Sequence, residues 1–367
     1  MIFVETQNFA SLPSLPNPYP VHTLTLTPPA RERKPTKIVI GESLIDDLAS
    51  ALKTESFDRV VLLYDKGIEA IAQRIQKSLP SCISIPVPPG DASKSLQEVE
   101  RITALMLDAG CTRNTLLICS GGGMLTDLGG FVAGVFMRGI ACVLVPTSLL
   151  AVCDAAIGGK TAVNAGGRKN MIGTLSHPES VMIDLELLKK LPQAQFSEGL
   201  VEVIKIAAMV DAPFFSWLEE NIGEVMKRTS TELSECVSRA IEAKVRIVEQ
   251  DEHDRDTRLL LNFGHTIGHA VEALSRYKLS HGAAVSIGMI AEMKTLQSKD
   301  LKRVSDLLQA IAMPLSILDS MSADALWAVM LSDKKNENGA VRCAVPISIG
   351  EGAVKTLTGE QFLTLFP

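Results

Sequence analysis

Short apolar segments alternate with amphipathic ones between residues 37 and 147, and this rhythm constrains the fold more than any other feature. Five segments have the length and apolar character of buried strands: KIVIG (37–41), RVVLLYD (59–65), CISIPV (82–87), TLLICS (115–120) and ACVLVPT (141–147). Segments with helical spacing follow the first three. Strands that alternate with helices form βαβ units. The sequence therefore predicts an α/β domain with a mainly parallel sheet and helices on its faces.

The pattern changes near residue 190. Helical periods then dominate up to AVRCAVPISIG (340–350), which is the next clear strand candidate. Residues 11–35 hold seven of the 18 prolines, and VHTLTLT (21–27) alternates like an edge strand. We predict three parts: a Pro-rich lead with an edge strand (1–35), the α/β domain (36–190) and a helical domain (191–367). A cleft between two such domains is a common place for a site.

Composition excludes several classes of protein. Lys and Arg total 36 against 42 Asp and Glu, a net charge of -6, and aromatic residues make up only 4%. This argues against a nucleic-acid partner, and taken alone it also disfavours a small anionic ligand. No apolar run reaches the roughly 18 residues of a membrane helix, and the first 20 residues do not resemble a secretory signal. Seven dispersed cysteines without a CxxC pair are typical of reduced thiols in the cytoplasm.

Two glycine-rich segments follow strand candidates. SGGGMLTDLGGF (120–131) comes directly after TLLICS, where backbone amides and a helix N-terminus can approach a phosphate. The same glycines would also suit an ordinary tight turn, and Asp65 at a strand end suits either a ribose hydroxyl or a helix cap. The segment 146–173 is typical of an anion-binding loop because it gathers polar side chains among glycines, namely Asp154, Lys160, Asn164, Arg168, Lys169 and Asn170.

The helical half contains carboxylate, amide and imidazole groups. Glu202 and Lys205 share one helix face within GLVEVIK, either as a buried ion pair or as a metal ligand beside a substrate cation. In RLLLNFGHTIGHAVE (258–272), Arg258, Asn262, His265 and His269 form one stripe if the segment is helical throughout, although Gly264 could instead start the helix. His281 follows. Two imidazoles and a distant Glu match an open, catalytic zinc site.

Together these motifs resemble the 3-dehydroquinate synthase family, within the wider sugar-phosphate cyclases, over roughly residues 38–350. The resemblance rests on GGGMLTDLGGFVAGVFMRG, VPTSLLAVCDAAIGGKTAVN, RKNMIG, GLVEVIK, RLLLNFGHTIGHAVE, HG and DKK, in that order. It implies a Rossmann-like, NAD-binding N-terminal domain and an all-α C-terminal domain. It also implies conversion of 3-deoxy-D-arabino-heptulosonate 7-phosphate to 3-dehydroquinate and phosphate, in the shikimate route to aromatic amino acids. The resemblance further implies that the protein uses NAD and a divalent metal, zinc or cobalt, as cofactors and that it forms a homodimer.

The resemblance assigns roles to residues of this chain. The implied metal ligands are Glu202, His265 and His281. The implied NAD site contains Asp65, Asp91, Lys94, Gly122, Gly123, Asp127, Thr147 and Ser148. The implied catalytic residues are Asp154, Lys160, Lys205, Lys244, Arg258, Asn262 and His269. The implied substrate-binding residues are Lys169, Asn170, Arg138 and one of Lys334 and Lys335. Of these, Arg138 would reach the phosphate in the neighbouring subunit's site.

The implied reaction explains these residue types. It oxidises a secondary alcohol with NAD, which is transiently reduced, eliminates phosphate, re-reduces the ketone with the NADH formed, opens the ring and closes it by an intramolecular aldol step. A metal lowers the pKa of the hydroxyl, cations hold the phosphate, and an Arg can hold a carboxylate in two contacts. Six basic residues converging on one cleft can bind a small dianion despite the net charge of -6.

Several positions depart from the family pattern. Asp91 stands where Glu is usual, Ser148 where Thr is usual, and Ala283 where Glu usually follows HG. Lys190, Ala194 and Gln195 replace Thr, Arg and Glu in a region that touches NAD in the family. None removes an implied metal ligand or substrate-site cation, so we predict an active enzyme.

Three alternatives remain. The first is a cyclase that makes an inosose or a valiolone from a substrate without a carboxylate. The second is a polyol or alcohol dehydrogenase of the similar iron-dependent architecture. The third is a catalytically silent binding protein. Arg258, Asn262 and Lys244 favour the carboxylate substrate.

Overall fold

The computed structural model describes residues 4–5, 23–24, 35–276, 278–318, 320–331 and 341–366. Contacts divide the chain into two compact units, Met1–Pro35 and Thr36–Pro367. In the first unit, β1 (Val4–Glu5) pairs antiparallel with β2 (Thr23–Leu24). β2 lies within the edge strand predicted at 21–27. The rest of that prediction lies outside the described residues. The domain boundary near 190 falls inside the second unit and stays a prediction.

The second unit contains a parallel six-stranded sheet, as the strand–helix rhythm predicts. Its strands are β3 (Lys37–Gly41), β4 (Arg59–Asp65), β5 (Ile83–Val87), β6 (Thr115–Gly121), β7 (Ala141–Pro146) and β10 (Ser180–Asp184). They lie in the order β3-β10-β7-β6-β4-β5. The chain moves outward from β4 to β5 and then crosses back to β6. The carboxyl ends of β4 and β6 therefore form the crevice where ligands bind in such sheets.

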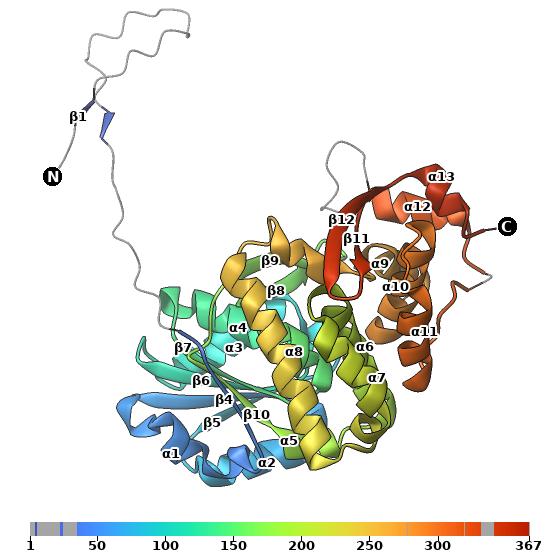
Figure 1. Cartoon of the computed structure of the whole chain (residues 1–367). Coiled ribbons are helices and arrows are strands. Elements are labelled where there is room, and N and C mark those ends of the chain that lie inside the picture. The colour runs from blue at the N-terminus through green and yellow to red at the C-terminus, as the bar shows by residue number, and fades with distance from the viewer. Residues whose placement is uncertain are drawn as a thin grey trace, which may run out of the picture. The chain divides into compact units, whose positions relative to one another are not determined.

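Helices cover both faces of this sheet (Figure 1). They are α1 (Leu48–Leu52), α2 (Glu69–Ser78), α3 (Leu96–Asp108), α4 (Gly123–Val135) and α5 (Leu185–Lys189). Successive strand residues point to opposite faces: Leu63 packs in one core with α3 and α4, and Leu62 in another with α1 and α2. All seven residues of β6 are buried, which explains its continuous apolar sequence.

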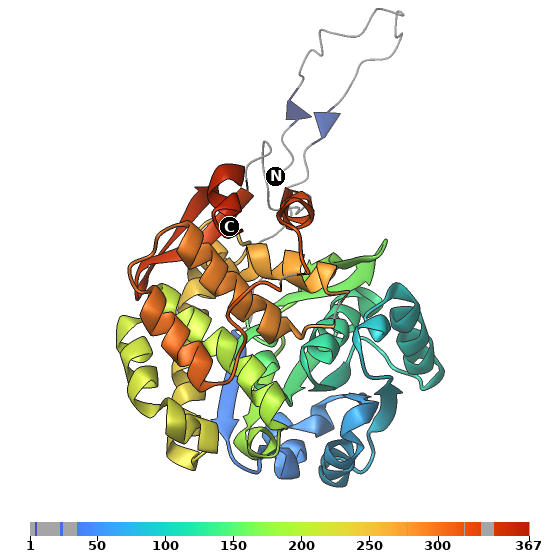
Figure 2. The ribbon, with the colours of Figure 1, turned by 90° about the vertical axis from the view of Figure 1, so that its right-hand side faces the viewer.

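The chain beyond residue 190 is mainly helical, as predicted (Figure 2). Its helices are α6 (Gln193–Val210), α7 (Ala212–Lys227), α8 (Ser230–Gln250), α9 (His265–Leu274), α10 (His281–Thr295), α11 (Leu301–Ala310), α12 (Ala323–Leu331) and α13 (Gly359–Leu363). Both α6 and α10 are apolar around most of their circumference and are buried accordingly. Each is therefore a central helix that neighbours surround.

Two antiparallel hairpins add to this plan. β8 (Lys160–Ala165) pairs with β9 (Arg168–Leu175), in the segment predicted to be an anion-binding loop. β11 (Val341–Ser348) pairs with β12 (Glu351–Leu357) in the helical half, and only the first of these strands was predicted. Neither β9 nor β12 has a mostly buried face, so their sequences lack the apolar alternation that identifies a strand.

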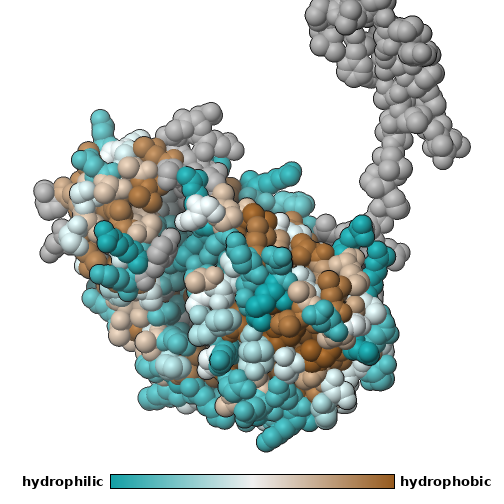
Figure 3. All heavy atoms as spheres, turned by 180° about the vertical axis from the view of Figure 1, so that it is seen from behind, coloured by the Kyte–Doolittle hydropathy of each residue, from teal (hydrophilic) through white to brown (hydrophobic). Residues whose placement is uncertain are grey.

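Hydrophilic side chains surround separate apolar areas on the face that Figure 3 shows. A mixed surface of this kind is ordinary for a globular protein. Within the described ranges, no helix combines the length and apolar character needed to cross a membrane. All seven cysteines lie in these ranges as free thiols.

Candidate active site

Three helices bring Glu202, His265 and His281 together. Glu202 lies in α6, and the two histidines are the first residues of α9 and α10. The Nε2 atoms of His265 and His281 lie 3.8 and 3.4 Å from Oε1 of Glu202. One donor atom from each residue lies within 4.8 Å of the other two. A single ion placed among them could contact all three.

Close packing of α9 against α10 produces this geometry. Gly264 has φ +77°, and a Cβ at that position would lie 2.4 Å from Cγ of Met289. A Cβ at Gly288, in α10, would lie 2.0 Å from the carbonyl oxygen of Gly264. Both positions therefore require glycine.

The helix consequently begins at His265, which settles the alternative left open by Gly264. Arg258 and Asn262 instead lie in a separate 3₁₀ helix, η7 (Thr257–Asn262), so the four residues do not form one continuous helical stripe.

The surroundings of Glu202 fit a divalent cation. Its side chain is only 1% exposed, and neither carboxylate oxygen has a partner with hydrogen-bond geometry among the described residues. Lys205 Nζ contacts Oε2 as an ion pair. Burial alone would raise the pKa of Glu202, but Lys205 and the two imidazoles outweigh it and hold that pKa well below its usual value. A buried carboxylate whose Oε1 faces two imidazoles is a donor set for zinc or cobalt.

Glu292 is a carboxylate of α10 that the sequence did not reveal as part of the site. Its side chain is fully buried, and it accepts hydrogen bonds from the backbone N–H groups of Gly264 (2.7 Å) and Ile267 (3.1 Å). These are free donors of the first turn of α9, the turn that carries His265. The one sequence signal is an acid within the apolar stretch GAAVSIGMIAEM (282–293). Glu292 thus caps the helix that presents His265.

Asp154 and Lys244 form a second charged pair beside this cluster. Asp154 lies in a π-helical turn, η6 (Ala151–Ala155), against which α6 and α8 pack. Lys244, on α8, is buried and donates to both the carboxylate and the backbone carbonyl of Asp154. Burial opposes ionisation of Asp154, but Lys244 and Lys205 lower its pKa below the usual range. The two lysines therefore favour the ionised form of Asp154.

The other predicted cations are held by partners from both halves of the chain. Lys160 Nζ lies 2.6 Å from Asp254, and Lys169 Nζ lies 2.7 Å from Glu272. The buried guanidinium of Arg258 donates to the carbonyl oxygens of Glu252 (2.8 Å) and Gly158 (3.1 Å). The hairpin β8–β9 is thereby joined to α9 and to the segment before η7.

Lys94 links residues predicted for the nucleotide site with one predicted for the substrate. Its ammonium lies 2.5 Å from Asp127 and also donates to Asn170. Asn170, at φ +55°, donates its backbone N–H to Asn164 Oδ1 (3.0 Å). Asn164 Nδ2 in turn donates to Asp91 Oδ2 (2.8 Å). The five residues form one polar network, in which Asn170 contributes both its side chain and its backbone N–H.

The crevice between β4 and β6 fits a dinucleotide phosphate. Gly122 caps α4 without a side chain, and a Cβ there would lie 3.5 Å from Oγ of Ser148. Thr147 donates its backbone N–H to the carbonyl oxygen of Gly121 (2.9 Å). The first N–H groups of α4, starting at Gly123, therefore lie in a glycine-lined turn at the carboxyl end of β6, which we call the glycine cradle and which a phosphate can approach. Asp65 Oδ1 accepts from Gly67 N (2.7 Å), so this residue acts as a cap.

The remaining predicted residues are His269, Asn262, Arg138, Lys334 and Lys335. The His269 ring lies 5.2 Å from that of His265, measured between centroids, and Asn262 ends η7 nearby in the chain. Arg138 is exposed at the end of η5 (Phe136–Arg138), and its reach toward a second subunit stays a prediction. Lys334 and Lys335 lie outside the described residues.

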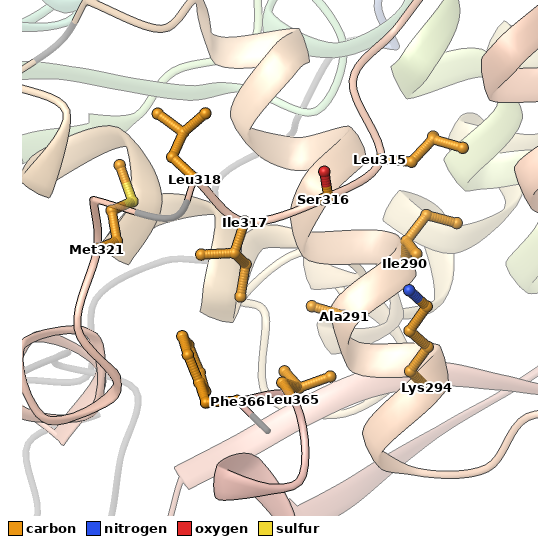
Figure 4. A pocket seen from close by; sticks show the side chains of 10 residues that line it. All are labelled: Ile290, Ala291, Lys294, Leu315, Ser316, Ile317, Leu318, Met321, Leu365 and Phe366. Carbon is orange, nitrogen blue, oxygen red and sulfur yellow. The ribbon is translucent and has the colours of Figure 1, made fainter.

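A hollow of about 310 Å³ lies elsewhere, between α10, the segment around Ile317 and Phe366 near the C-terminus (Figure 4). Its α10 residue Ile290 is nine residues from His281, about 13 Å along the helix axis. The lining is apolar apart from Ser316 and Lys294. This composition offers none of the paired acids and bases that surround Glu202.

Comparisons with known proteins agree with this geometry. The model of the 3-dehydroquinate synthase N-terminal domain matches residues 84–198, and that of the C-terminal domain matches residues 199–336. A 3-dehydroquinate synthase from Thermodesulfovibrio yellowstonii is 37% identical over 332 residues, 88% of this chain and 92% of the relative. One from Buchnera aphidicola subsp. Baizongia pistaciae is 37% identical over 313 residues, 83% and 87% of the two chains.

A solved structure shares the fold. It is a 2-epi-5-epi-valiolone synthase from Streptomyces hygroscopicus subsp. jinggangensis 5008 with NAD+ and Zn2+ bound. The match has a TM-score of 0.83 at 23% identity and covers 93% of this chain and 98% of that one. The two family models and the relatives at 37% identity place the present chain in the 3-dehydroquinate synthase family.

Proposed function

We propose that this protein is a 3-dehydroquinate synthase, a carbon–oxygen lyase that converts 3-deoxy-D-arabino-heptulosonate 7-phosphate to 3-dehydroquinate and phosphate. The observation that carries the proposal is the buried Glu202 carboxylate, which meets two imidazoles where α6, α9 and α10 converge. The relatives at 37% identity that bear this name support it. We assign the protein to the cytoplasm, as expected for this biosynthetic step and for free thiols.

NAD and a divalent metal complete the proposed site. The metal would be held by Glu202, His265 and His281, and the nucleotide would lie at the carboxyl ends of β4 and β6. NAD would contribute reversible hydride acceptance, and zinc or cobalt would contribute Lewis acidity. The glycine cradle at Gly122, with the free N–H groups of α4, supports the dinucleotide assignment.

The side chains around the metal position then bind and orient the substrate. Arg258 is oriented by two carbonyl contacts and has five N–H donors, so it retains donors for the substrate carboxylate. Lys160 and Lys169 lie on one hairpin and supply positive charge for the phosphate. Asp154 accepts from Lys244 and has further acceptor capacity for a substrate hydroxyl.

These cations are paired with protein groups in the structure. The substrate phosphate therefore competes with Asp254 for Lys160 and with Glu272 for Lys169. Exchange of one anionic partner for another limits the electrostatic cost of binding. The negative net charge of the chain does not oppose this, because the relevant charges are local.

The other residues that we propose to contact the substrate are Asn262, His269, Asn170, Lys205 and one of Lys334 and Lys335. We further propose a homodimer in which the exposed Arg138 reaches the neighbouring site. Neither a nucleic acid nor a membrane is proposed as a partner.

A panel of sugar phosphates tests the proposed substrate. Purified protein with catalytic NAD and zinc is expected to release phosphate from 3-deoxy-D-arabino-heptulosonate 7-phosphate. A heptulose phosphate without the carboxylate should react at least about a hundredfold more slowly, because the buried Arg258 would lose an ionic partner, a difference of about 3 kcal/mol. Phosphate release and product identity are measured for each compound.

The alternative cyclase has a clear signature in the same panel. Its substrate would be the heptulose phosphate without a carboxylate, and the heptulosonate would remain unreacted. A useful control is Arg258→Met, which should lower activity on the carboxylate substrate while leaving zinc content unchanged. Equal activity of this variant and the parent would contradict the assignment of Arg258.

A further inference from the structure

Glu272 joins two parts of the proposed site and has no role assigned by the sequence motifs. It lies in α9, one turn beyond His269, and its side chain is 8% exposed. Oε1 lies 2.7 Å from Nζ of Lys169, on hairpin strand β9. Oε2 lies 3.6 Å from Nδ1 of His281, at the start of α10. One carboxylate therefore contacts both a substrate-side lysine and an implied metal ligand.

The two nitrogens of His281 face different carboxylates. Nε2 is the atom near Glu202, and Nδ1 is the atom near Glu272. A neutral imidazole carries its proton on only one nitrogen. If Nδ1 holds the proton and directs it to Glu272, the lone pair of Nε2 points to Glu202, where the metal would lie. Carboxylates that orient ligand histidines in this way raise metal affinity.

We propose that Glu272 is a positioning residue, which selects the metal-binding tautomer of His281 and at the same time holds Lys169 beside the site. The inference rests on the proposed function, because it places the metal at Glu202, His265 and His281. It predicts that loss of the Glu272 charge weakens metal binding although no ligand is removed.

A second set of donor atoms would give Glu272 a different role, that of a metal ligand. The experiment distinguishes this role from the proposed one. His269, Glu272 and His281 also have donor atoms within 4.8 Å of one another. A metal in that set would use Nδ1 of His281 and bind Glu272 directly. Each carboxylate contacts a lysine through one oxygen. The Glu202 set is favoured because Oε1 of Glu202 lies within 3.8 Å of Nε2 of both His265 and His281 and its side chain is more deeply buried than that of Glu272, 1% against 8% exposed.

The experiment is a cobalt titration of the full-length, metal-free protein, followed by visible absorption and by competition with a chelator. Glu272→Gln is expected to bind cobalt about 10 to 100-fold more weakly, with the same band positions as the parent. Glu272→Asp should fall between the two. Lys169→Met should leave cobalt affinity close to that of the parent, because it removes no contact of His281.

Asp184→Asn is the matched control. Asp184 is another buried carboxylate, and it accepts hydrogen bonds from the backbone N–H groups of Ser43, Ile45 and Glu186. Its loss should lower stability without changing cobalt affinity. Far-ultraviolet circular dichroism before each titration shows that the variants are folded.

Three outcomes would overturn the inference. Unchanged affinity in Glu272→Gln would show that Glu272 does not act on His281, and complete loss of the cobalt bands would make Glu272 a ligand. An equal loss of affinity in Asp184→Asn would reduce the effect to general destabilisation. Failure of the parent itself to bind cobalt would contradict the proposed function, and so the two failures are distinguishable.

Discussion

Replacement of Glu202 by Gln is expected to lower kcat/KM for phosphate release by about a thousandfold or more. The substitution preserves shape but replaces the anionic ligand at the convergence of α6, α9 and α10. Lewis-acid stabilisation contributes several kcal/mol, and about 4 kcal/mol corresponds to roughly a thousandfold in rate. The measurement combines steady-state kinetics with the zinc content of the purified variant.

Two controls separate the loss of metal from general damage. Glu220→Gln changes an exposed acid of the neighbouring helix α7 and should leave both activity and zinc content unchanged. NAD binding should survive in Glu202→Gln, since the glycine cradle lies at the sheet. A fully zinc-loaded variant with parental activity would contradict the assignment of Glu202.

Replacement of Lys205 by Met is expected to make the stability of the protein depend strongly on metal. Lys205 and Glu202 are a buried ion pair, with side chains 3% and 1% exposed. Removal of one partner from such a pair costs about 3 to 5 kcal/mol, because the other charge stays buried. The metal-free variant should therefore unfold at markedly lower urea concentration than the metal-free parent.

Zinc should restore most of this loss, because a cation at Glu202 replaces the missing ammonium. The stabilisation by zinc is thus predicted to be larger in Lys205→Met than in the parent. The double variant Glu202→Gln/Lys205→Met should be more stable than Lys205→Met alone in the absence of metal. A metal-free Lys205→Met variant as stable as the parent would show that the imidazoles already compensate Glu202.

The parallel sheet was predictable because the apolar sequence of each strand identifies it without reference to the rest of the fold. RVVLLYD and TLLICS are buried on both faces and are bounded by helical segments, so local sequence and tertiary environment agree. The strand β9 could not be found in this way. All its residues but one are exposed, and its glycine and polar side chains are equally compatible with a loop.

The part of the site that lies within sequence motifs was predictable. The motifs identified Glu202, His265 and His281, and the structure places their donor atoms together. The contacts of Glu272 and Glu292 depend on how β9, α9 and α10 pack, and no spacing along the chain encodes this. The sequence also left open whether Arg258 and Asn262 continue the helix of His265, and the glycine contacts between α9 and α10 decide that question.

The most direct test of the account measures phosphate release and net NADH formation in the same reaction, with NAD present at a small fraction of the heptulosonate 7-phosphate. The account predicts many phosphates released for each NAD, without accumulation of NADH and with complete loss of activity after chelation of the metal. Stoichiometric NADH build-up, or phosphate release that survives removal of the metal, would contradict it.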